Sequence, residues 1–543
     1  MNDRLGQFDN YANDNPKALR RMSKIFSMAC AALSAVTNMD DDRRTHRVTA
    51  TIPSATAYPV RLRFTLQGMS SPSGWTVHRS VGIWMMGSWR FSRGEVEEVS
   101  HLPETRELRV SVAATAKSHD TIIDDIDEVG REIGGNVLLD LCVKLGRAAV
   151  NANPAFETIS RMHLTPSFGT ASTASVVMNT VYGLTPLGCR QADEPTFDGD
   201  DEDIRTIMIN RRLIAVTDDQ QQALALGNAR YPIIGIQAAF GTGKTVVGAY
   251  IAVRHASRGQ RVVVTASTNT AVSQFTETIL SLDEFSHVGV VRFIAETIAF
   301  DDIATTAVDM HEVLKSLGSR FADRLSTSER RVCDRFTTGR TRYERYKRGN
   351  YMELTEQEKD DFMMAEQDVC ETLEAMIELM FRLVAPRIIC ITTSSLLNTT
   401  DKGGIFKGYV NTFDLLIGDE ASQIPEPVFM AIASRLEGAR HIYIGDVRQL
   451  EPYARCSRLA NPARFGARSI IDTLLTARAV PIAPLVTTFR AHPALNSLPN
   501  TFAYEGTLVN GIRAVDRQLL AGVVRFPNPA VPFAFVDVKG TSA

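Results

Sequence analysis

The sequence lacks the residue patterns that mark metal-binding, secreted and membrane-spanning proteins. Its seven cysteines contain no Cys-x-x-Cys pair, and no nearby histidines complete a zinc spacing. We therefore interpret them as buried thiols of an intracellular protein, cytoplasmic or nuclear. No apolar run reaches the roughly 20 residues that a membrane-spanning helix needs. The apolar stretch 25–36 resembles a signal peptide, but its alanines and serines and the aspartates before it favour a buried helix.

A dominant charge of one sign is also absent. Lysine and arginine total 59 against 62 aspartates and glutamates, so net charge points to no partner. A nucleic-acid-binding protein can still be nearly neutral when its basic groups cluster. At 543 residues, the chain has room for roughly three to four domains of about 100 to 200 residues each.

The first part of the chain changes from a helical to a strand period. Residues 1–45 are predicted to form a helical segment that ends in an acidic cluster. Apolar and polar residues then alternate at 60–66 and again at 108–112, which is typical of half-buried strands. With the regularly spaced glycines between them, these strands predict a small antiparallel β domain, a barrel, over residues 46–118.

The remainder of the chain is predicted to be an α/β protein. Residues 119–205 indicate a helical segment followed by an acidic linker. From residue 206, short apolar strands alternate with helices, which predicts a parallel sheet over residues 206–478. A charged helical block at 304–386 interrupts the alternation. Residues 479–543 are predicted to begin a second domain of the same kind.

The charged block allows two interpretations. Its first half is rich in arginine and its second half in glutamate and aspartate, with apolar residues at helical spacing. One interpretation is a helical hairpin whose charges are simply solvated. The other is a basic face, interleaved with Tyr343 and Tyr346, that contacts a phosphate backbone.

The strongest single motif predicts a phosphate-binding loop. Residues 237–245 read Gln-Ala-Ala-Phe-Gly-Thr-Gly-Lys-Thr, between a strand and a helix. In such a loop, backbone N–H groups and the helix N-terminus converge on phosphates. Lys244 is predicted to reach the β- and γ-phosphates, and Thr245 to offer its hydroxyl to Mg²⁺. The predicted nucleotide-binding residues here are Ala239, Phe240, Gly241, Thr242, Gly243, Lys244 and Thr245.

One position departs from the usual form of this loop. The first loop position is normally glycine, and this chain has Ala238. An alanine disfavours positive φ, so the loop is strained if the position needs positive φ. If the position does not need it, little is lost.

Two further strands end in acidic residues. The strand at 414–418 precedes Asp419 and Glu420, which predicts that Asp419 holds Mg²⁺ and that Glu420 orients and deprotonates the attacking water. The strand at 441–445 precedes Asp446, and Gln449 is predicted to lie near the γ-phosphate.

Three motifs in fixed order resemble a known family. Residues 419–423 read Asp-Glu-Ala-Ser-Gln, residues 445–450 contain Gly-Asp-x-x-Gln-Leu, and residues 489–493 read Phe-Arg-Ala-His-Pro. The set resembles superfamily 1 helicases, in the branch of the nonsense-mediated decay RNA helicase. The resemblance implies a RecA-like fold, ATP and Mg²⁺ as cofactors, and single-stranded RNA or DNA as the partner. It also implies that the barrel and the helical insertion contact the nucleic acid.

The resemblance assigns further roles by motif position. It implies that Gln220 reads the adenine edge, that Phe489 stacks on adenine, and that Arg490 stabilises charge developing at the γ-phosphate. Thr488 replaces the family's glutamine, and Glu451 replaces a proline. Small polar residues that hydrogen-bond phosphates without reading sequence are implied at two loops. They are Ser267, Thr268, Asn269, Thr392 and Thr393.

The resemblance stops near the end of the sequence. Relatives continue with most of a second RecA-like domain, whereas here that domain is expected to be incomplete, which indicates a fragment, a truncated product or a chain without motor function. The leading hypothesis is an ATP-dependent helicase or translocase on single-stranded nucleic acid, with RNA favoured over DNA. The alternative is a degenerate ATP-binding clamp or scaffold that does not unwind. A P-loop ATPase of another class leaves residues 445–450 and 489–493 unexplained.

Overall fold

The computed structural model describes residues 45–536 with gaps. The gaps are 53–58, 69–74, 78, 87–89, 103, 134, 146–171, 182–203, 297–304, 349–354, 402, 454–457, 460–463, 465–466, 478–479 and 520–522. The chain divides into two compact units. We call them the barrel unit, described mainly over 45–145, and the sheet unit, described over 172–452 and 468–536 with the gaps above. The predicted helix in 1–45 and the acidic linker lie outside the described residues, except for residues 45, 204 and 205.

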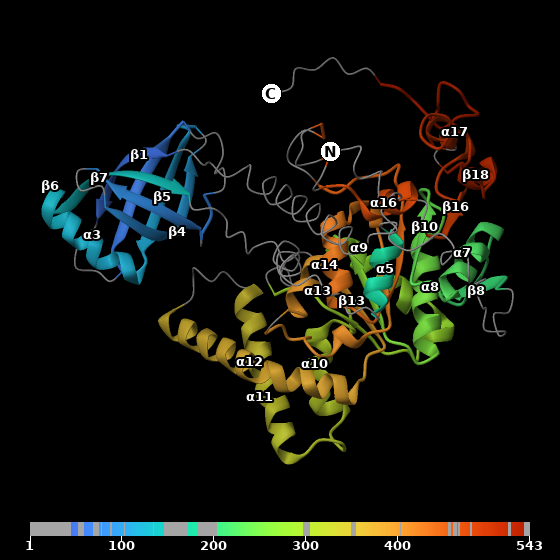
Figure 1. Cartoon of the computed structure of the whole chain (residues 1–543), viewed down its shortest axis with the longest axis horizontal. Helices are drawn as coiled ribbons and strands as arrows, with labels where there is room; N and C mark the ends of the chain where they lie inside the picture. The colour runs from blue at the N-terminus through green and yellow to red at the C-terminus, as the bar shows by residue number, and fades with distance from the viewer. Residues whose placement is uncertain are drawn as a thin grey trace. The chain divides into compact units, whose positions relative to one another are not determined.

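The barrel unit is a closed antiparallel barrel of six strands (Figure 1). Its elements are β1 (His46–Ile52), β2 (Arg61–Gln67), β3 (Ser80–Met85), β4 (Phe91–Leu102), β5 (Glu107–Ala114), α3 (Ala116–Val129), β6 (Arg131–Ile133) and β7 (Asn136–Leu145). The order is β1-β2-β5-β4-β3-β7, and pairing of β1 with β7 closes the barrel. Leu62, Phe64 and Leu66 of β2 point into the core, as their alternation with polar residues predicts.

The predicted end of the barrel at residue 118 is wrong. Residues 131–145 were expected to be helical, but they form β6 and β7, and β7 is the strand that closes the barrel. Leu139, Leu141 and Val143 are buried in the barrel core. The strand forms because these apolar residues recur at every second position, a period that suits a strand with one buried face.

The sheet unit is built on a seven-stranded sheet in which each strand pairs in parallel with its neighbours. The order is β12-β13-β11-β14-β15-β10-β16. The strands are β10 (Ile233–Ala238), β11 (Val262–Ala266), β12 (Val290–Arg292), β13 (Ile388–Thr392), β14 (Leu415–Gly418), β15 (Arg440–Gly445) and β16 (Ile482–Leu485). The central strands are buried on both faces, which explains their continuous apolar sequences. This is the predicted RecA-like α/β architecture.

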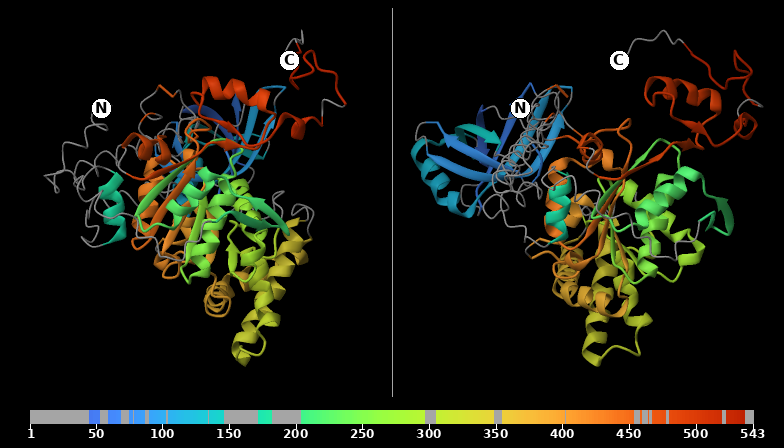
Figure 2. Two further views of the ribbon diagram at one scale, coloured as in Figure 1. Left: turned by 90° about the vertical axis from the view of Figure 1, so that its right-hand side faces the viewer. Right: turned by 45° about the vertical axis from the view of Figure 1, so that its right-hand side comes forward.

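Helices cover both faces of this sheet (Figures 1 and 2). One face carries α7 (Asp218–Asn228), α8 (Lys244–Ser257) and α9 (Asn269–Leu280); the other carries α5 (Thr173–Val181), α13 (Thr393–Thr399), α14 (Glu426–Arg435) and α16 (Ile470–Ala477). A hairpin of β8 (Thr206–Ile209) and β9 (Arg212–Ala215) precedes α7. Short 3₁₀ helices span Asp283–Phe285, Val410–Thr412, Ala421–Gln423 and Ala514–Arg517.

The predicted boundary of a second domain at residue 479 is also wrong. Residues 482–485 form β16, which pairs in parallel with β10 as the edge strand of the first sheet. Beyond it, the described residues form β17 (Thr487–Thr488), α17 (Pro493–Phe502) and β18 (Val509–Asn510), with β17 and β18 paired in parallel. The strand pairs with β10 from Gly235 opposite Ile482 to Ala238 opposite Leu485, and the Ile482 side chain occupies the space beside Gly235.

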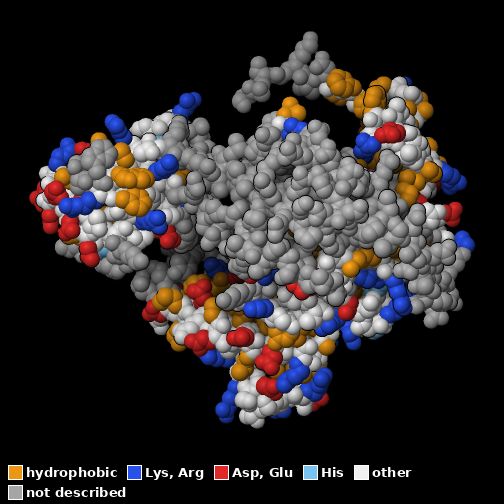
Figure 3. Space-filling view, viewed as in Figure 1, with side chains coloured by type: hydrophobic (Ala, Val, Ile, Leu, Met, Phe, Trp, Pro, Cys, Tyr) orange, Lys and Arg blue, Asp and Glu red, His pale blue; other side chains and the backbone are white. Residues whose placement is uncertain are grey.

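The charged block forms three helices between β12 and β13. They are α10 (Met310–Arg320), α11 (Thr327–Arg348) and α12 (Glu356–Leu383). A capping box starts α12, because the Thr355 hydroxyl accepts from the Glu358 amide while the Glu358 carboxylate accepts from the Thr355 amide. Acidic and basic side chains are interspersed on the exposed surface of these helices (Figure 3).

The two tyrosines of the charged block do not lie on an exposed basic face. Tyr343 and Tyr346 are buried, and Tyr343 stacks on Phe362 of α12 with ring centroids 5.2 Å apart. The aromatic rings therefore hold α11 against α12 and offer no exposed face for a base. Arg335 pairs with acidic residues of α12, so the structure favours a hairpin whose charges are solvated or paired.

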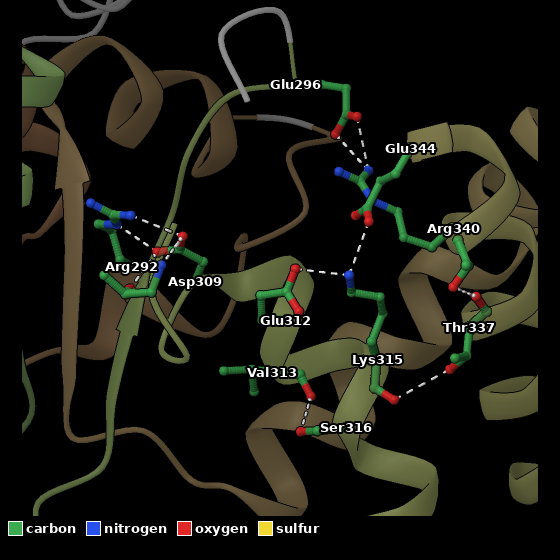
Figure 4. Close-up of polar contacts among 12 residues, drawn as sticks. Arg292, Glu296, Asp309, Glu312, Val313, Lys315, Ser316, Thr337, Arg340 and Glu344 are labelled. Atoms are coloured by element: carbon green, nitrogen blue, oxygen red, sulfur yellow. Dashed lines mark hydrogen bonds and ion pairs between the residues drawn. The ribbon is translucent and has the colours of Figure 1, made fainter. Parts of the chain in front are cut away.

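Buried charge pairs attach this helical block to the sheet (Figure 4). Arg292, at the end of β12, donates to both carboxylate oxygens of Asp309 at 2.5 and 2.9 Å, and Asp309 directly precedes α10. Arg340 of α11 is 2% exposed and binds Glu296 and Glu344. These contacts fix the insertion to the strand from which it emerges.

Among the described residues, no helix has both the length and the apolar character needed to cross a bilayer.

We expect Asp309→Ala to destabilise the sheet unit by about 3 to 5 kcal/mol, because it leaves the Arg292 guanidinium buried without its carboxylate. The measurement is the free energy of unfolding in a urea titration. The matched control is Asp368→Ala, which breaks the half-exposed pair with Arg335 and should leave the unfolding midpoint almost unchanged. Equal effects of the two variants would contradict the assignment of Arg292–Asp309 as the anchor.

Candidate nucleotide site

The loop between β10 and α8 has the backbone that its sequence predicts. Gly241 and Gly243 adopt left-handed conformations with φ of +70° and +80°, which side chains disfavour. Ala238 ends β10 and pairs with Leu485, and it is absent from the positive-φ residues of the described chain. Alanine in place of the usual glycine at position 238 therefore does not strain the loop, because the position does not adopt positive φ.

The lysine of this loop meets the acidic pair that follows β14. Lys244 Nζ lies 2.5 Å from Glu420 Oε1, and both side chains are largely buried. β10 and β14 both pair with β15, so their carboxyl ends lie at the same edge of the sheet. Glu420 has a φ of 49°, an uncommon value for a side chain that is often found at functional sites.

Asp419 is a buried carboxylate with an unmatched oxygen. The residue is 2% exposed, and its Oδ1 has no hydrogen-bond partner among the described residues. Burial raises the pKa of Asp419 to about 6; Lys244 acts in the opposite direction, and Glu420 adds to the increase. A cation would compensate this buried charge.

The residues fit a magnesium ion that is shared with a nucleotide. Thr245 follows Lys244 in the first turn of α8, and hydroxyl and carboxylate oxygens are the ligands that Mg²⁺ prefers. The described residues contain no cluster of three or more His, Cys, Asp or Glu that could hold a metal alone. A Mg²⁺ bound by few protein oxygens and completed by phosphates and water is consistent with both observations.

Asp446 organises the end of β15. It is 1% exposed, and four groups donate hydrogen bonds to it. The Oδ1 atom accepts from Gln237 Nε2 at 2.9 Å and from the Arg448 amide at 3.0 Å. The Oδ2 atom accepts from Gln449 Nε2 and from Tyr504 Oη, each at 2.6 Å. Gln449 thus lies at the predicted edge of the sheet, held by Asp446.

The segment after β16 packs directly on the phosphate-binding loop. The buried Thr488 donates its hydroxyl to the Phe240 carbonyl at 2.7 Å, and the Phe489 amide donates to the Gly241 carbonyl at 2.9 Å. A Cβ on Gly241 would lie 2.4 Å from Cβ of Arg490. The structure therefore places Arg490 beside the loop, with its side chain exposed.

The two residues predicted to contact adenine, Gln220 and Phe489, lie near the loop, and both contact other residues of the protein. Gln220 Nε2 donates to the Thr242 carbonyl at 2.9 Å, and its Oε1 accepts from the Thr217 amide at 3.1 Å. The Phe489 ring packs against Gly511, where an added Cβ would lie 2.4 Å from Cε1. Their roles toward adenine remain predictions.

The predicted nucleic-acid contacts are only partly accessible. Ser267 donates to the Gln423 carbonyl at 2.9 Å, and Thr268 is exposed and accepts from the Ala271 amide at 3.2 Å, which caps α9. Asn269 is half-buried at the start of α9. Thr392 and Thr393 are 7% and 5% exposed, and Thr392 caps α13. The hydroxyls of Ser267, Thr268 and Thr392 therefore form hydrogen bonds within the protein. Contact of these residues with a phosphate backbone remains a prediction.

Sequence reasoning missed Gln237 and Tyr504. Gln237 is the penultimate residue of β10, so its position just before the loop was a usable signal. Tyr504 is 58 residues from Asp446, and no local pattern links the two. Only the packing of residues 487–510 against the loop brings them together.

The comparisons with known proteins bear on this geometry. Residues 215–455 match a family described as an AAA domain. The chain is 26% identical over 327 residues to the regulator of nonsense transcripts 1 homolog of Drosophila melanogaster, which covers 59% of this chain and 24% of that protein. The chain is a relative of the superfamily 1 helicases of the nonsense-mediated decay branch. The ordered motifs had indicated this relationship, and it is confirmed.

Other relatives are helicases by name. The mouse 5'-3' DNA helicase ZGRF1 is 25% identical over 326 residues, 56% of this chain and 15% of that protein. An uncharacterized ATP-dependent helicase of Caenorhabditis elegans, C05C10.2, is 25% identical over 174 residues, 31% of this chain and 11% of that protein. The chain thus matches about a quarter or less of the length of these relatives. Its similarity is to proteins that are named helicases.

We expect Asp419→Asn to stabilise the protein at pH 7.5 in EDTA without nucleotide. The pKa of Asp419 is raised above its ordinary value of 3.8 to about 6, so the native state favours the protonated form. Above pH 6, the ionised group costs the native state up to about 3 kcal/mol, and below pH 4 this cost disappears. The gain, measured by urea titration, should therefore shrink as the pH falls from 7 to 4.

The matched control is Asp446→Asn, another buried carboxylate of this sheet edge. It places an amide donor among four donors, so we expect a loss of about 1 to 3 kcal/mol. Destabilisation by both substitutions would contradict the conclusion that one oxygen of Asp419 lacks a hydrogen-bond partner.

Proposed function

We propose that this protein hydrolyses ATP while bound to single-stranded nucleic acid, and that it acts as a helicase or translocase. The observation that carries the proposal is the meeting of Lys244, Asp419 and Glu420 at one edge of the sheet. RNA is favoured over DNA because several relatives are named regulators of nonsense transcripts, although one is named a DNA helicase.

The phosphate-binding loop supplies the recognition step. Its left-handed glycines let the backbone approach phosphates closely, and the N-terminus of α8 favours an anion. Lys244 pairs with Glu420, so a bound phosphate competes with that carboxylate for the ammonium group. Transfer of Lys244 to the phosphates frees Glu420.

The freed Glu420 performs the hydrolytic step. It accepts a hydrogen bond from the attacking water and takes up its proton as the oxygen bonds to the γ-phosphorus. The bond between that phosphorus and the oxygen bridging to the β-phosphorus breaks, and ADP leaves. Asp419 and Thr245 would hold Mg²⁺, which would supply positive charge to offset the negative charge of the phosphates. Gln449 and Arg490 provide donors around the γ-phosphate, where charge develops in the transition state.

The alternative is an ATP-binding clamp that does not turn over. The close packing of residues 488–490 on the phosphate-binding loop motivates this alternative. A segment held this closely can respond to a bound nucleotide with little movement. A clamp binds ATP and nucleic acid but releases no phosphate and separates no strands.

Phosphate release with and without single-stranded RNA or DNA tests the proposal. We expect turnover to increase with nucleic acid and to fall at least about 100-fold in Glu420→Gln, because general-base catalysis contributes that much. Lys244→Ala should lose both turnover and ATP affinity. Arg335→Ala, on the exposed helical hairpin, is the control and should behave as wild type.

Two outcomes contradict the proposal. Turnover that persists in Lys244→Ala would place the chemistry elsewhere. ATP binding by the wild type without any phosphate release would favour the clamp, and a fluorescent duplex-unwinding assay then confirms that no strand separation occurs.

A further inference from the structure

The turn that follows α17 is attached to the end of β15 at two points. Tyr504 Oη donates to Asp446 Oδ2, and Arg448 Nη2 lies 2.8 Å from Glu505 Oε1. The turn spans residues 504–507, with the Thr507 amide donating to the Tyr504 carbonyl at 2.9 Å. Glu505 and Gly506 both have positive φ, as the two central residues of a type I′ turn do.

Tyr504 also contacts the phosphate-binding loop. Its ring meets the Phe240 ring edge to face, with centroids 5.7 Å apart. Burial raises the pKa of its hydroxyl far above the usual range, and the hydrogen bond to Asp446 adds to the increase. The Phe240 backbone and the Gln449 side chain act in the opposite direction because they also interact with the hydroxyl. Tyr504 therefore remains a neutral donor, placed where the loop, Asp446 and Gln449 meet.

Two donors share one oxygen of Asp446. Gln449 Nε2 and Tyr504 Oη both donate to Oδ2, while Gln237 and the Arg448 amide satisfy Oδ1. If Gln449 turned its amide to a γ-phosphate, Oδ2 would lose one donor. A buried carboxylate oxygen left without any donor is costly, and the Tyr504 hydroxyl removes that cost.

We propose that Tyr504 is a positioning residue for ATP hydrolysis, which keeps Asp446 satisfied while Gln449 turns toward the γ-phosphate and thereby links nucleotide state to the segment after α17. This inference rests on the proposed ATPase function. Tyr504 itself touches no reacting atom; it acts through Asp446 and Gln449. Tyr504 is also the first residue of the turn at 504–507. A rotation of the Gln449 side chain away from Asp446 therefore changes the strength of the hydrogen bond that holds this turn.

Tyr504→Phe tests the proposal, since it keeps the ring on Phe240 and removes only the hydroxyl. We expect kcat to fall about tenfold, the effect of losing one hydrogen bond to a charged group, with KM for ATP within twofold of wild type. The matched control is Tyr409→Phe, a half-buried tyrosine stacked on Phe381 of α12, which should leave both constants unchanged. Glu505→Gln weakens the second attachment only and should also leave kcat near wild type.

Two results overturn the proposal. One is an unchanged kcat in Tyr504→Phe. The other is a decrease in kcat of Tyr504→Phe that comes with a similar increase in KM, together with an equal loss of kcat in Glu505→Gln. That result would mean that the turn only supports the structure.

A second readout does not depend on turnover. Hydrogen exchange of residues 504–507 is measured with and without Mg²⁺ and a non-hydrolysable ATP analogue. We expect the analogue to change exchange at this turn in the wild type and not in Tyr504→Phe. A wild type that binds the analogue without any change at the turn overturns the inference, whereas a wild type that shows this change but releases no phosphate contradicts only the proposed hydrolysis.

Discussion

The parallel register of β10, β14 and β15 is the constraint on which the candidate site depends. Each strand ends at the same edge of the sheet, so residues at these ends are brought together although they lie up to 209 positions apart in the sequence. Lys244 meets Glu420, and Gln237 meets Asp446, only because these strands align. The apolar strands are buried on both faces, and that burial stabilises the alignment.

Two buried carboxylates at this edge of the sheet differ in their hydrogen bonding. Asp446 is buried with four donors, whereas Asp419 is equally buried with an oxygen that none of the described residues satisfies. The first arrangement stabilises the fold, and the second costs stability and suits a cation. Proteins often retain such local costs where they bind ligands, so the contrast supports the proposed cation-binding role of Asp419.

Much of this organisation could be predicted from the sequence because it is local. The phosphate-binding loop, the strand before Asp419 and the alternation of β2 all depend on neighbouring residues. The closing strand β7 was missed because its apolar residues were interpreted as part of a helix, and β16 was assigned to a second domain because its pairing with β10 joins distant segments. Burial of Tyr343 and the contact of Tyr504 with Asp446 arise from tertiary packing, which no local period encodes.

The account depends most on the claim that Lys244 exchanges Glu420 for the phosphates of a nucleotide. A crystal structure with Mg²⁺ and a non-hydrolysable ATP analogue tests this directly. The account predicts phosphates against the loop at 239–245, Lys244 Nζ bound to the β- and γ-phosphates, and Mg²⁺ between Thr245 and Asp419. A nucleotide bound at another place, or a Lys244–Glu420 pair at its present 2.5 Å beside bound phosphates, would contradict it.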